Sequence, residues 1–486
     1  MAETMLTGEE SLDPSDWGAL SELGRRMVDD MMEYLRTVRE RPVWQPIPQS
    51  VKDALRVPMP MEPEGIEQVY RDFQRLVLPY PTGNIHPRFW GWVMGNGTPF
   101  AMLAEMLAAG INLNQGGLAQ AGGLVEAQVI DWCKEMMGFP ASASGILVSG
   151  GSMANLIGLT VARNARAGFD VRAEGMQNGQ PPMTLYASSE VHSSVQKSVE
   201  ILGFGNNALR RIPVSREYAI DLQALRAKIR EDRSRGMRPL CIIGCAGTVN
   251  TGASDDLEAL AAICIEERLW FHIDGAFGAL AALSPSLQSV VKGMVLADSL
   301  AFDMHKWMYL PYEVGCTLVR DASTHLHAFT LTPDYLEHTT RGIGGSDLWF
   351  SDYGVQLSRG FRALKVWMCI KEHGIKRFGR LIRQNVEQAH YVEGLVRKEA
   401  ELELLAPVPL NIVCFRYTGK TRGTPSLNEL NKELLLRLHE SGVAAPSYTM
   451  LGDSYALRVA ITNHRSRFED FDILVREVLR IGRELE

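Results

Sequence analysis

The sequence predicts an α/β protein with a large domain built on a mainly parallel sheet, an N-terminal helical segment and a small C-terminal α+β domain. In residues 86–380, short apolar runs alternate with helix-like stretches, the order that parallel strands with helical crossovers require. The chain has 486 residues, of which 46% are hydrophobic and 22% charged. This composition is that of a globular protein with a large core and two or three folding units.

The first expected unit is the N-terminal segment, residues 1–85. It contains a methionine-rich amphipathic stretch around residues 27–35, followed by a part of the sequence in which proline recurs often. Short helices joined by extended, proline-rich connectors make a poor core of their own, because proline ends helices and cannot donate to a sheet. We therefore expect this segment to pack on another surface, of its own chain or of a second subunit.

The large domain, residues 86–380, carries the alternating pattern. Ligands of such sheets bind at the carboxyl ends of the strands, so the residues that follow each strand are candidates for a functional site. The acidic start of one helical stretch suits a helix N-terminus. The expected strands are 145–149, 184–187, 240–244 and 269–274, and the helices after the first three are 153–165, 193–202 and 255–268.

The third expected unit is residues 381–486. Two long helical stretches, 379–400 (which starts just before the boundary) and 427–442, are combined there with short strands. Helices packed on a few strands are typical of a small α+β domain.

Composition and charge exclude several classes of function. The net charge is −7 with scattered lysines and arginines, which gives no reason to expect nucleic acid or an anionic membrane as a partner. The chain shows no apolar stretch of transmembrane length and no signal peptide at its start. Its seven cysteines are few and odd in number, and Cys241 and Cys245 lack the further ligands of a zinc site. Reduced thiols, no bound metal and a cytoplasmic location are therefore expected.

Two short motifs carry the strongest chemical signal. Asp274 ends an expected strand, and Lys306 follows an apolar segment, between His305 and Trp307. A lysine amine bonds to the aldehyde of pyridoxal phosphate (PLP), and a carboxylate keeps the pyridine nitrogen of PLP protonated. Each residue alone has an ordinary explanation, because acids cap turns and lysines extend from strand ends to solvent. Together they favour PLP, and we expect burial to lower the pKa of Lys306 towards the neutral amine.

Three other motifs are expected at the same edge of the sheet. Ser149–Asn155 joins a strand to a helix through two glycines, where backbone N–H groups and the Ser152 hydroxyl suit a phosphate. The turn also suits a dinucleotide or plain chain reversal, although the order G-x-G-x-x-G is missing. His192 either stacks on a flat ring or is held within a turn. The hydroxyl of Thr248 either touches a cofactor or caps its turn.

Taken together, these motifs make the chain resemble the group II PLP-dependent amino-acid decarboxylases of fold type I, the family that includes aromatic L-amino acid decarboxylase. The likeness covers about residues 80–400 and extends more loosely over both ends. The motifs that follow the family's order are His-Pro-x-Phe at 86–89, the glycine–serine turn, His-Ser-Ser at 192–194, Asp-Gly-Ala at 274–276, His-Lys-Trp at 305–307, Pro-Asp-Tyr-Leu at 333–336 and Arg-Gly-Phe-Arg-Ala-Leu-Lys at 359–365.

The resemblance implies a set of cofactor contacts. Lys306 bonds covalently to PLP, Asp274 pairs with the ring nitrogen, and His192 stacks on the ring. The other implied contacts are Gly151, Ser152 and His305 at the phosphate, Asp303 close to it at a position where some relatives carry asparagine, Ala276 beneath the ring, and Thr248 beside it.

The resemblance also implies the reaction. Tyr335 falls on a mobile loop, where it returns a proton to the carbon that has lost CO₂. In the family, tyrosine there and histidine at the ring-stacking position accompany simple decarboxylation, whereas phenylalanine in place of that tyrosine accompanies oxidative formation of an aldehyde. This chain has Tyr335 and His192. The glycine-containing segment 332–352 is typical of a gating flap, although Tyr335 as an ordinary exposed loop residue remains open.

The expected substrate is an aromatic L-amino acid such as tyrosine, DOPA, tryptophan or phenylalanine, converted to the amine and CO₂. Trp92 and Val93 fall in the substrate pocket that the resemblance implies. The segments 90–96 and 112–123 depart from the aromatic decarboxylases. A smaller or acidic substrate such as glutamate therefore stays open, and so does a core role for Trp92.

Several alternatives accompany this interpretation. Other fold type I chemistry, such as oxidative decarboxylation, transamination or aldol cleavage, shares the lysine and the acid. Two alternatives propose a different class of function. One is a PLP-binding protein without catalytic activity, and the other is a nucleotide-binding α/β protein without PLP. Arg359 and Arg362 either hold a carboxylate or tie the flap to the large domain, and we expect the second role for at least one. A homodimer is expected, because in the family the N-terminal segment packs against the partner.

Overall fold

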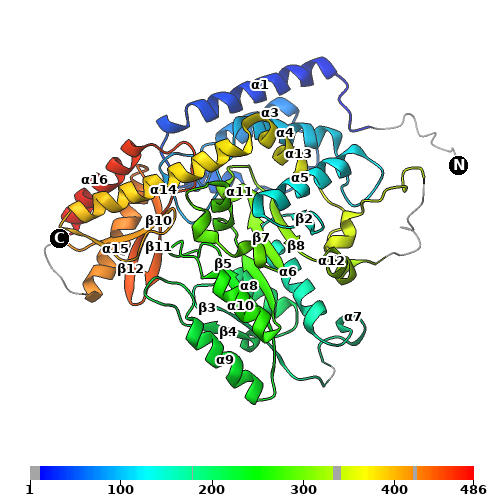
Figure 1. Cartoon of the computed structure of the whole chain (residues 1–486). Helices are drawn as coiled ribbons and strands as arrows, with labels where there is room; N and C mark the ends of the chain where they lie inside the picture. The colour runs from blue at the N-terminus through cyan, green and yellow to red at the C-terminus, as the bar shows by residue number, and fades with distance from the viewer. Residues whose placement is uncertain (1–10, 178, 332–340, 420–423) are drawn as a thin grey trace.

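The architecture comes from a computed structural model that describes residues 11–177, 179–331, 341–419 and 424–486. Two sheets, each packed with helices, make up most of the chain (Figure 1). Within these ranges, no helix has both the length and the apolar character that crossing a membrane requires.

The larger sheet is mainly parallel, which confirms the predicted fold class. β8 runs antiparallel to its neighbours β2 and β7, and the remaining neighbours pair in parallel. Every strand predicted for this domain overlaps an observed one. In spatial order the strands are β2 (Ser144–Val148), β8 (Gly315–Val319), β7 (Ser299–Asp303), β6 (Trp270–Asp274), β5 (Arg238–Cys245), β3 (Met183–Ser188) and β4 (Leu209–Ile212).

Helices cover both faces of this sheet. The strand β5 shows why: Ile242 joins one hydrophobic core, whereas its neighbours Cys241 and Ile243 join another. Successive side chains of a strand point to opposite faces, so two cores mean that neither face is open to solvent. The principal helices of the large domain are α4 (Pro99–Ile111), α5 (Ala121–Met137), α6 (Gly151–Arg166), α8 (Ser193–Ile201), α9 (Leu222–Ser234), α10 (Leu257–Glu267), α12 (Ala322–Phe329) and α13 (Arg362–His373).

Several of these helices begin where the sequence signals a start. Asp256 caps α10 by accepting a hydrogen bond from the backbone N–H of Ala259. Thr98 caps α4 in the same way and is followed by Pro99 at the first helical position. Proline is tolerated there because the first N–H groups of a helix have no partner within the helix.

A second, five-stranded sheet is formed mainly by the C-terminal part of the chain. The exception is β1, which pairs in parallel with β11 although it lies far earlier in the sequence. Residues 89–90, which we assigned to the large domain, therefore belong to the small sheet. The division of the chain at residues 85 and 380 stays a prediction. The elements are β1 (Phe89–Trp90), β11 (Ala445–Leu451), β12 (Ser454–Ala460), β10 (Ile412–Tyr417) and β9 (Leu402–Leu404), with helices α14 (Ile375–Lys398), α15 (Thr424–Glu440) and α16 (Phe468–Leu485).

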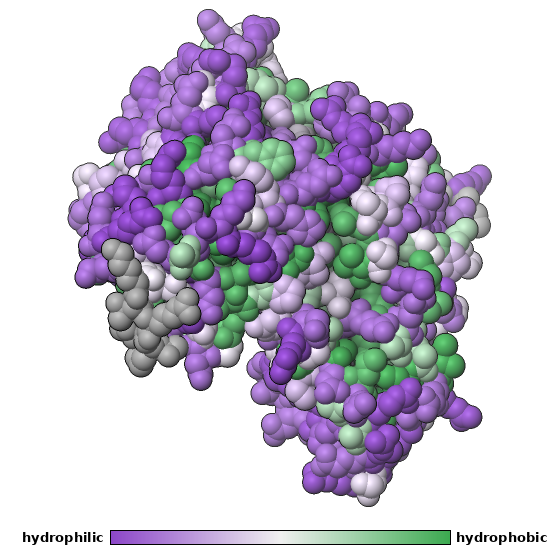
Figure 2. Space-filling model, turned by 60° about the vertical axis from the view of Figure 1, so that its left-hand side comes forward, coloured by the Kyte–Doolittle hydropathy of each residue, from purple (hydrophilic) through white to green (hydrophobic). Residues whose placement is uncertain are grey.

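The N-terminal segment lies along one side of the molecule, with α1 (Trp17–Arg36) at its edge (Figure 1). This helix buries only Leu23. On the face shown in Figure 2, hydrophobic residues gather around a recess in an otherwise mainly hydrophilic surface. Large apolar side chains of the segment that remain exposed are Leu12, Trp17, Met27, Ile47, Leu55, Val57, Met59, Met61, Ile66, Val69 and Val77.

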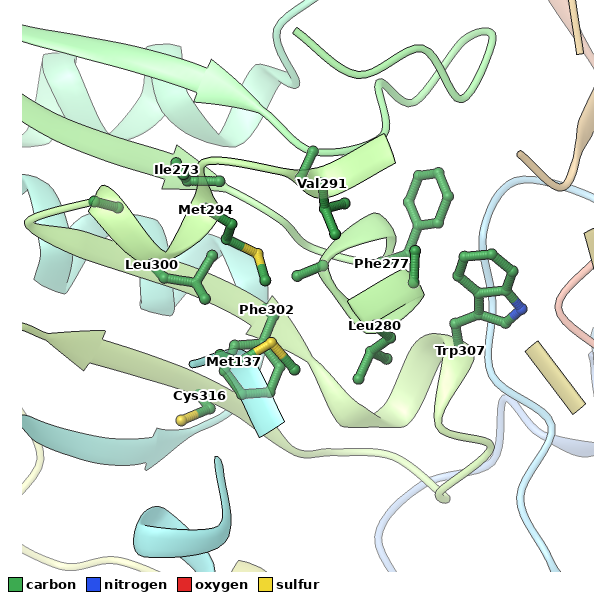
Figure 3. Packing of buried hydrophobic residues seen from close by; sticks show 14 of the residues in the cluster. Met137, Ile273, Phe277, Leu280, Val291, Met294, Leu300, Phe302, Trp307 and Cys316 are labelled. Carbon is green, nitrogen blue, oxygen red and sulfur yellow. The ribbon is translucent and has the colours of Figure 1, made fainter. Parts of the chain in front are cut away.

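A closely packed core supports the segment that carries Lys306. Trp307 is fully buried and its ring lies 5.9 Å from that of Phe277 (Figure 3). Its indole N–H donates to Oδ1 of Asn385 at 3.0 Å, and Asn385 lies on α14. Because the residue next to Lys306 is fixed by both packing and a hydrogen bond, the lysine has a rigid support.

Candidate active site

The topology brings the predicted site residues to one edge of the large sheet. β3, β5, β6 and β7 are parallel, and β2 shares their direction because β8 is antiparallel to both β2 and β7. The turns after their carboxyl ends therefore lie together, as expected for a sheet of this class. They carry Ser149–Ser152 after β2, His192 after β3, Thr248 after β5, Asp274 and Ala276 at the end of β6, and Asp303–Lys306 at the end of β7.

Two neighbouring cavities open at this edge. One, of about 600 Å³, is lined by the glycine turn and by Asp303, His305 and Lys306. The other, of about 180 Å³, is lined by Asp274, Thr248, Trp92 and other residues. Side chains that border both cavities are His192, Ala276 and Lys306.

Lys306 is held by an acid rather than lying in an apolar pocket. Its Nζ is 2.8 Å from Oδ2 of Asp303, and 22% of its side-chain surface remains exposed. Desolvation lowers the pKa of Lys306, but the charge and hydrogen bond of Asp303 and the charge of Asp274 outweigh it, so the pKa lies above its ordinary value. The expectation of a lowered pKa is therefore wrong, because it considered burial without the neighbouring carboxylates.

Asp274 is 5% exposed and is oriented by two donors. Its Oδ1 accepts from the backbone N–H of Ala276 at 3.1 Å, and its Oδ2 accepts from Nδ2 of Asn155 at 3.1 Å. The Oδ1 atom of Asn155 is 2.9 Å from Nε2 of His272. Burial lowers the pKa of His272 to about 3. A neutral imidazole that donates from Nε2 fixes which way the Asn155 amide points, and so directs an N–H group at Asp274.

Asn155 is a site residue that the sequence interpretation missed. It stands in the glycine–serine motif, three positions after Ser152 on α6. Residues three apart share a face of a helix, so the face that carries Ser152 at the cavity also carries Asn155. That spacing was the available signal, but only the tertiary structure shows the partner of Asn155.

The glycine turn leaves space beside the N-terminus of α6. Gly150 has φ of +155°, which side-chain-bearing residues rarely adopt. A Cβ atom at Gly151 would lie only 2.8 Å from Oδ2 of Asp303. Backbone N–H groups of the first helical turn have no partner within the helix and attract anions. The turn and the hydroxyl of Ser152, which lines the same cavity, can therefore hold a phosphate.

His305 contributes a neutral donor to this cavity. Its Nδ1 accepts from the backbone N–H of Val314 at 3.1 Å, so the ring proton is on Nε2. Burial lowers the pKa of His305, with the charge of Asp303 opposing the shift. Nε2 lies 3.9 Å from Oδ2 of Asp303, and the Tyr312 ring packs against the imidazole at 4.6 Å.

His192 is fixed by its own helix. Its Nδ1 accepts from the backbone N–H of Ser194 at 3.2 Å and lies 2.8 Å from the Ser194 hydroxyl. The hydroxyl also accepts from Nδ2 of Asn155 at 3.2 Å. Burial lowers the pKa of His192, with the charge of Asp274 opposing it. A flat, neutral imidazole therefore borders the cavity, and the same asparagine connects it to Asp274.

The remaining predicted residues are placed as follows. Thr248 is buried, its hydroxyl lies 3.2 Å from that of Thr251, and it lines the smaller cavity. Val93 lines the same cavity and is nearly buried. Trp92 is 59% exposed, which rules out the core role left open above. Tyr335 lies outside the described residues.

The two arginines have structural partners. The guanidinium of Arg359 is buried and bonds to both carboxylate oxygens of Glu126. Arg362 bonds to Oε1 of Glu313 at 2.9 Å. Arg359 thus has structural partners in the large domain, and its guanidinium lies 5.3 Å from the ring of Phe350 in the expected flap segment. That one of the two arginines ties this flap to the large domain stays a prediction.

This arrangement fits PLP. A glycine turn at a helix N-terminus and an acid with oriented oxygens border two neighbouring cavities, and the lysine borders both. The turn lacks side chains that would block a phosphate. PLP requires an amine for its aldehyde, a carboxylate for its ring nitrogen and an anion site for its phosphate. The fold and the site together define a PLP-dependent enzyme of fold type I.

Comparison with known proteins identifies the family. Residues 48–418 match the model of the pyridoxal-dependent decarboxylase conserved domain. The chain belongs to this family, the group II decarboxylases, and is a PLP-dependent amino-acid decarboxylase, which confirms the predicted enzyme class and cofactor.

Individual relatives cover nearly the whole chain. An aromatic-L-amino-acid decarboxylase of Bacillus atrophaeus is 34% identical over 96% of both chains. A phenylacetaldehyde synthase of a Rosa hybrid cultivar is 27% identical over 95% of this chain and 92% of its own. The crystal structure of Oryza sativa TDC with PLP and tryptamine superimposes with a TM-score of 0.90, at 24% identity, over 98% of this chain and 99% of that one. The last likeness confirms the fold.

Proposed function

We propose that this enzyme decarboxylates an aromatic L-amino acid to the corresponding amine and CO₂. The observation that carries the proposal is that Lys306 and Asp274 line the same cavity. The relative from Bacillus atrophaeus, an aromatic-L-amino-acid decarboxylase that matches along almost the entire chain, supports the aromatic class.

The catalytic roles follow from the chemistry of each group. When bound, PLP supplies an electron sink for the electron pair that CO₂ leaves behind. Lys306 would hold the cofactor through its Nζ, the amine that the PLP aldehyde requires. Asp274 keeps a proton on the pyridine nitrogen, and Asn155 orients Asp274 through the 3.1 Å bond to Oδ2. This second contact keeps the carboxylate in place, as supporting residues do in preorganised sites.

The other cofactor contacts surround these two residues. Gly151 and Ser152 hold the phosphate with backbone N–H and hydroxyl groups, and His305 donates from Nε2. His192, Ala276 and Thr248 line the smaller cavity together and would contact the cofactor ring there.

The substrate binds beside the ring. Trp92 and Val93 line the smaller cavity, where their apolar surfaces suit an aromatic side chain. Excluding water from the carboxylate favours its loss, because the dispersed charge that remains depends less on solvation. Tyr335 then donates its hydroxyl proton to the carbon that carried the carboxylate.

We also propose a homodimer in the cytoplasm. The N-terminal segment leaves a series of large apolar side chains exposed, among them Val57, Met59 and Met61. Exposed apolar surface of this kind marks a protein contact, and a second copy is the partner that the family resemblance implies. The seven cysteines are free and buried, which suits a reducing compartment. Sedimentation at the mass of two chains would support the dimer, and a monomer would contradict it.

A product assay tests the proposed reaction. The purified enzyme with added PLP is incubated separately with tyrosine, DOPA, tryptophan, phenylalanine and glutamate, and amine, CO₂, aldehyde and peroxide are measured. We expect amine and CO₂ in equal amounts from at least one aromatic substrate. Aldehyde with peroxide as the main products, or turnover of glutamate alone, would contradict the proposal.

Replacing Tyr335 with phenylalanine is expected to divert the reaction. Without the hydroxyl no proton is donated, so amine formation should fall by about 10²–10⁴-fold, the usual contribution of a positioned acid, and aldehyde should appear. The measurement is the ratio of aldehyde to amine after a fixed time. Tyr391→Phe is the matched control, because that hydroxyl bonds to Asp472 on the small domain. An unchanged product ratio in Tyr335→Phe would remove Tyr335 from the mechanism.

A further inference from the structure

The burial and hydrogen bonding of Asp303 are not explained by a contact with the phosphate alone. The side chain is 1% exposed. Its Oδ2 bonds to the Lys306 ammonium, whereas its Oδ1 has no hydrogen-bond partner among the described residues. A buried carboxylate oxygen without a partner is costly, and the cost is lower for a neutral carboxyl group than for a charged one.

The surrounding backbone is shaped around this carboxylate. A Cβ atom at Gly315 would lie 2.7 Å from Oδ1, and a Cβ atom at Gly151 would lie 2.8 Å from Oδ2. Glycine at both positions lets the carboxylate sit directly against the turn that starts α6. Asp303 therefore borders the place at which the helix N-terminus attracts an anion.

The charges in this cavity do not suit a dianion. Among the described residues that line it, Lys306 is the sole lysine or arginine, and Asp303 and Glu313 add two acids. Lys306 is already paired with Asp303. Other titratable groups that face Asp303 or border its cavity are His305, His192, Tyr312, Cys316 and Asp274. Burial lowers the pKa of both histidines, so neither supplies a ready cation.

We propose that Asp303 is a proton acceptor that becomes a neutral carboxyl group when a dianion occupies the glycine turn, and then donates a hydrogen bond to that dianion. In the empty site Asp303 is a carboxylate that keeps Lys306 charged. When a dianion occupies the site, the neutral carboxyl group of Asp303 donates a hydrogen bond to it, whereas a carboxylate would repel it. The inference deepens the proposed function, because it rests on the assignment of the glycine turn to the phosphate and of Lys306 to the cofactor aldehyde.

The proton balance of cofactor loading follows. Lys306 would have to lose one proton before its Nζ could bond to the aldehyde carbon of PLP, whose oxygen would leave as water. Oδ2 of Asp303 lies 2.8 Å from that Nζ and receives the proton directly. The pair changes from ammonium and carboxylate to amine and carboxylic acid, so no net charge is created in the cavity. Asp303 is thus a positioning and proton-holding residue rather than a group that touches the substrate.

Sulfate binding to the cofactor-free enzyme tests this directly. Sulfate remains a dianion between about pH 6 and 9, a range in which an ordinary carboxyl group is ionised. Sulfate forms no bond with Lys306, so the lysine keeps its proton and the proton on Asp303 must come from solvent. We therefore expect wild-type enzyme to take up about one proton per bound sulfate, measured calorimetrically in two buffers of different ionisation enthalpy. One linked proton also makes the affinity fall about tenfold per pH unit.

Asp303→Asn isolates the carboxyl group. An asparagine amide has the same shape and can donate without titrating, so this variant should bind sulfate with no proton uptake and with a pH-independent affinity. Asp298→Asn is the matched control, because Asp298 is an acid just before the start of β7, whereas Asp303 ends that strand, and it accepts from the backbone N–H of Phe271. The control should keep the wild-type proton uptake.

The outcomes separate this inference from the proposed function. Wild-type enzyme that takes up no proton, or Asp303→Asn enzyme that keeps the uptake, would overturn the role of Asp303. Borohydride reduction of the PLP-loaded wild-type enzyme followed by peptide mapping independently shows whether Lys306 carries the cofactor. A negative result in that experiment would reject the proposed function instead.

Discussion

Lys306→Ala enzyme is expected to lose decarboxylation by about 10⁴-fold or more, because the variant lacks the amine that bonds to PLP and exchanges it with the substrate. The space around Nζ is bordered by Asp303, Asp274 and His192, and among the described residues that line the two cavities no second lysine replaces it. The visible absorbance of the protein-bound cofactor should disappear as well. The measurement is turnover with an aromatic amino acid, together with the absorbance spectrum of the PLP-treated protein.

Two controls make this result specific. Lys292→Ala removes an exposed lysine that pairs with Glu258 on α10, and it should leave both turnover and spectrum unchanged. Lys306→Ala leaves the buried carboxylate of Asp303 without its partner, so the cofactor-free variant should be less stable than wild type. A circular dichroism spectrum like that of wild type at the assay temperature shows that the variant is still folded. Turnover within tenfold of wild type would show that Lys306 is not the cofactor lysine.

Of the single substitutions proposed for this protein, Arg359→Met is expected to lower the free energy of unfolding most. Arg359 and Glu126 are buried, with 1% and 0% of their side-chain surfaces exposed, and the guanidinium also donates to the backbone oxygens of Gln115 and Leu147. Removing one partner of a buried ion pair leaves an uncompensated charge, which costs about 3–5 kcal/mol. The measurement is the shift in the urea or thermal unfolding midpoint of the cofactor-free protein.

The double variant Arg359→Met with Glu126→Leu shows whether the unpaired charge of Glu126 causes the loss of stability. Once both charges are gone, the desolvation cost disappears, and stability should return most of the way to that of wild type. Arg397→Met is the control, because its pair with Glu393 lies largely in solvent, where a single ion pair contributes little. A double variant no more stable than Arg359→Met would show that the bonds to backbone oxygens, rather than the ion pair, hold this region.

Arg359 also connects stability to the site. It holds the carbonyl group of Leu147 on β2 at 2.7 Å, and the glycine turn begins just after this strand. Losing the arginine should therefore weaken PLP binding in addition to stability. The sequence left two roles open for this residue, because an arginine near a predicted flap suits a carboxylate of the substrate as well as one of the protein.

The sequence predicted the large fold well because its signals are local. The four predicted strands, β2, β3, β5 and β6, are short apolar runs, and helices follow the first three, as at Asp256 before α10. The strands β4 and β7 were not predicted. The antiparallel strand β8 and the pairing of β1 with β11 were not predicted. Pairing between strands depends on contacts distant in the chain, and no local pattern of residues 89–90 reveals its partner.

Motifs in the sequence pointed to candidate site residues, but not to their electrostatics. Lys306 and Asp274 stand in distinctive sequence contexts, so both could be proposed from the sequence. The direction of the pKa shift of Lys306 was wrong, because Asp303 lies three positions away and its carboxylate reaches Nζ only through the turn that follows β7. Burial and a neighbouring charge act in opposite directions, and distance decides between them.

By itself the sequence determined the fold class, the family and the groups that PLP chemistry requires, since these depend on periodicity and on a few residue types at set spacings. Only the tertiary structure decided which groups act on one another. It joined Asn155 to Asp274, set Asp303 beside Lys306 and buried Arg359 against Glu126. The reason is physical: hydrogen bonds require donor and acceptor atoms within about 3 Å, and charge interactions weaken with distance. Only the folded chain brings these atoms that close.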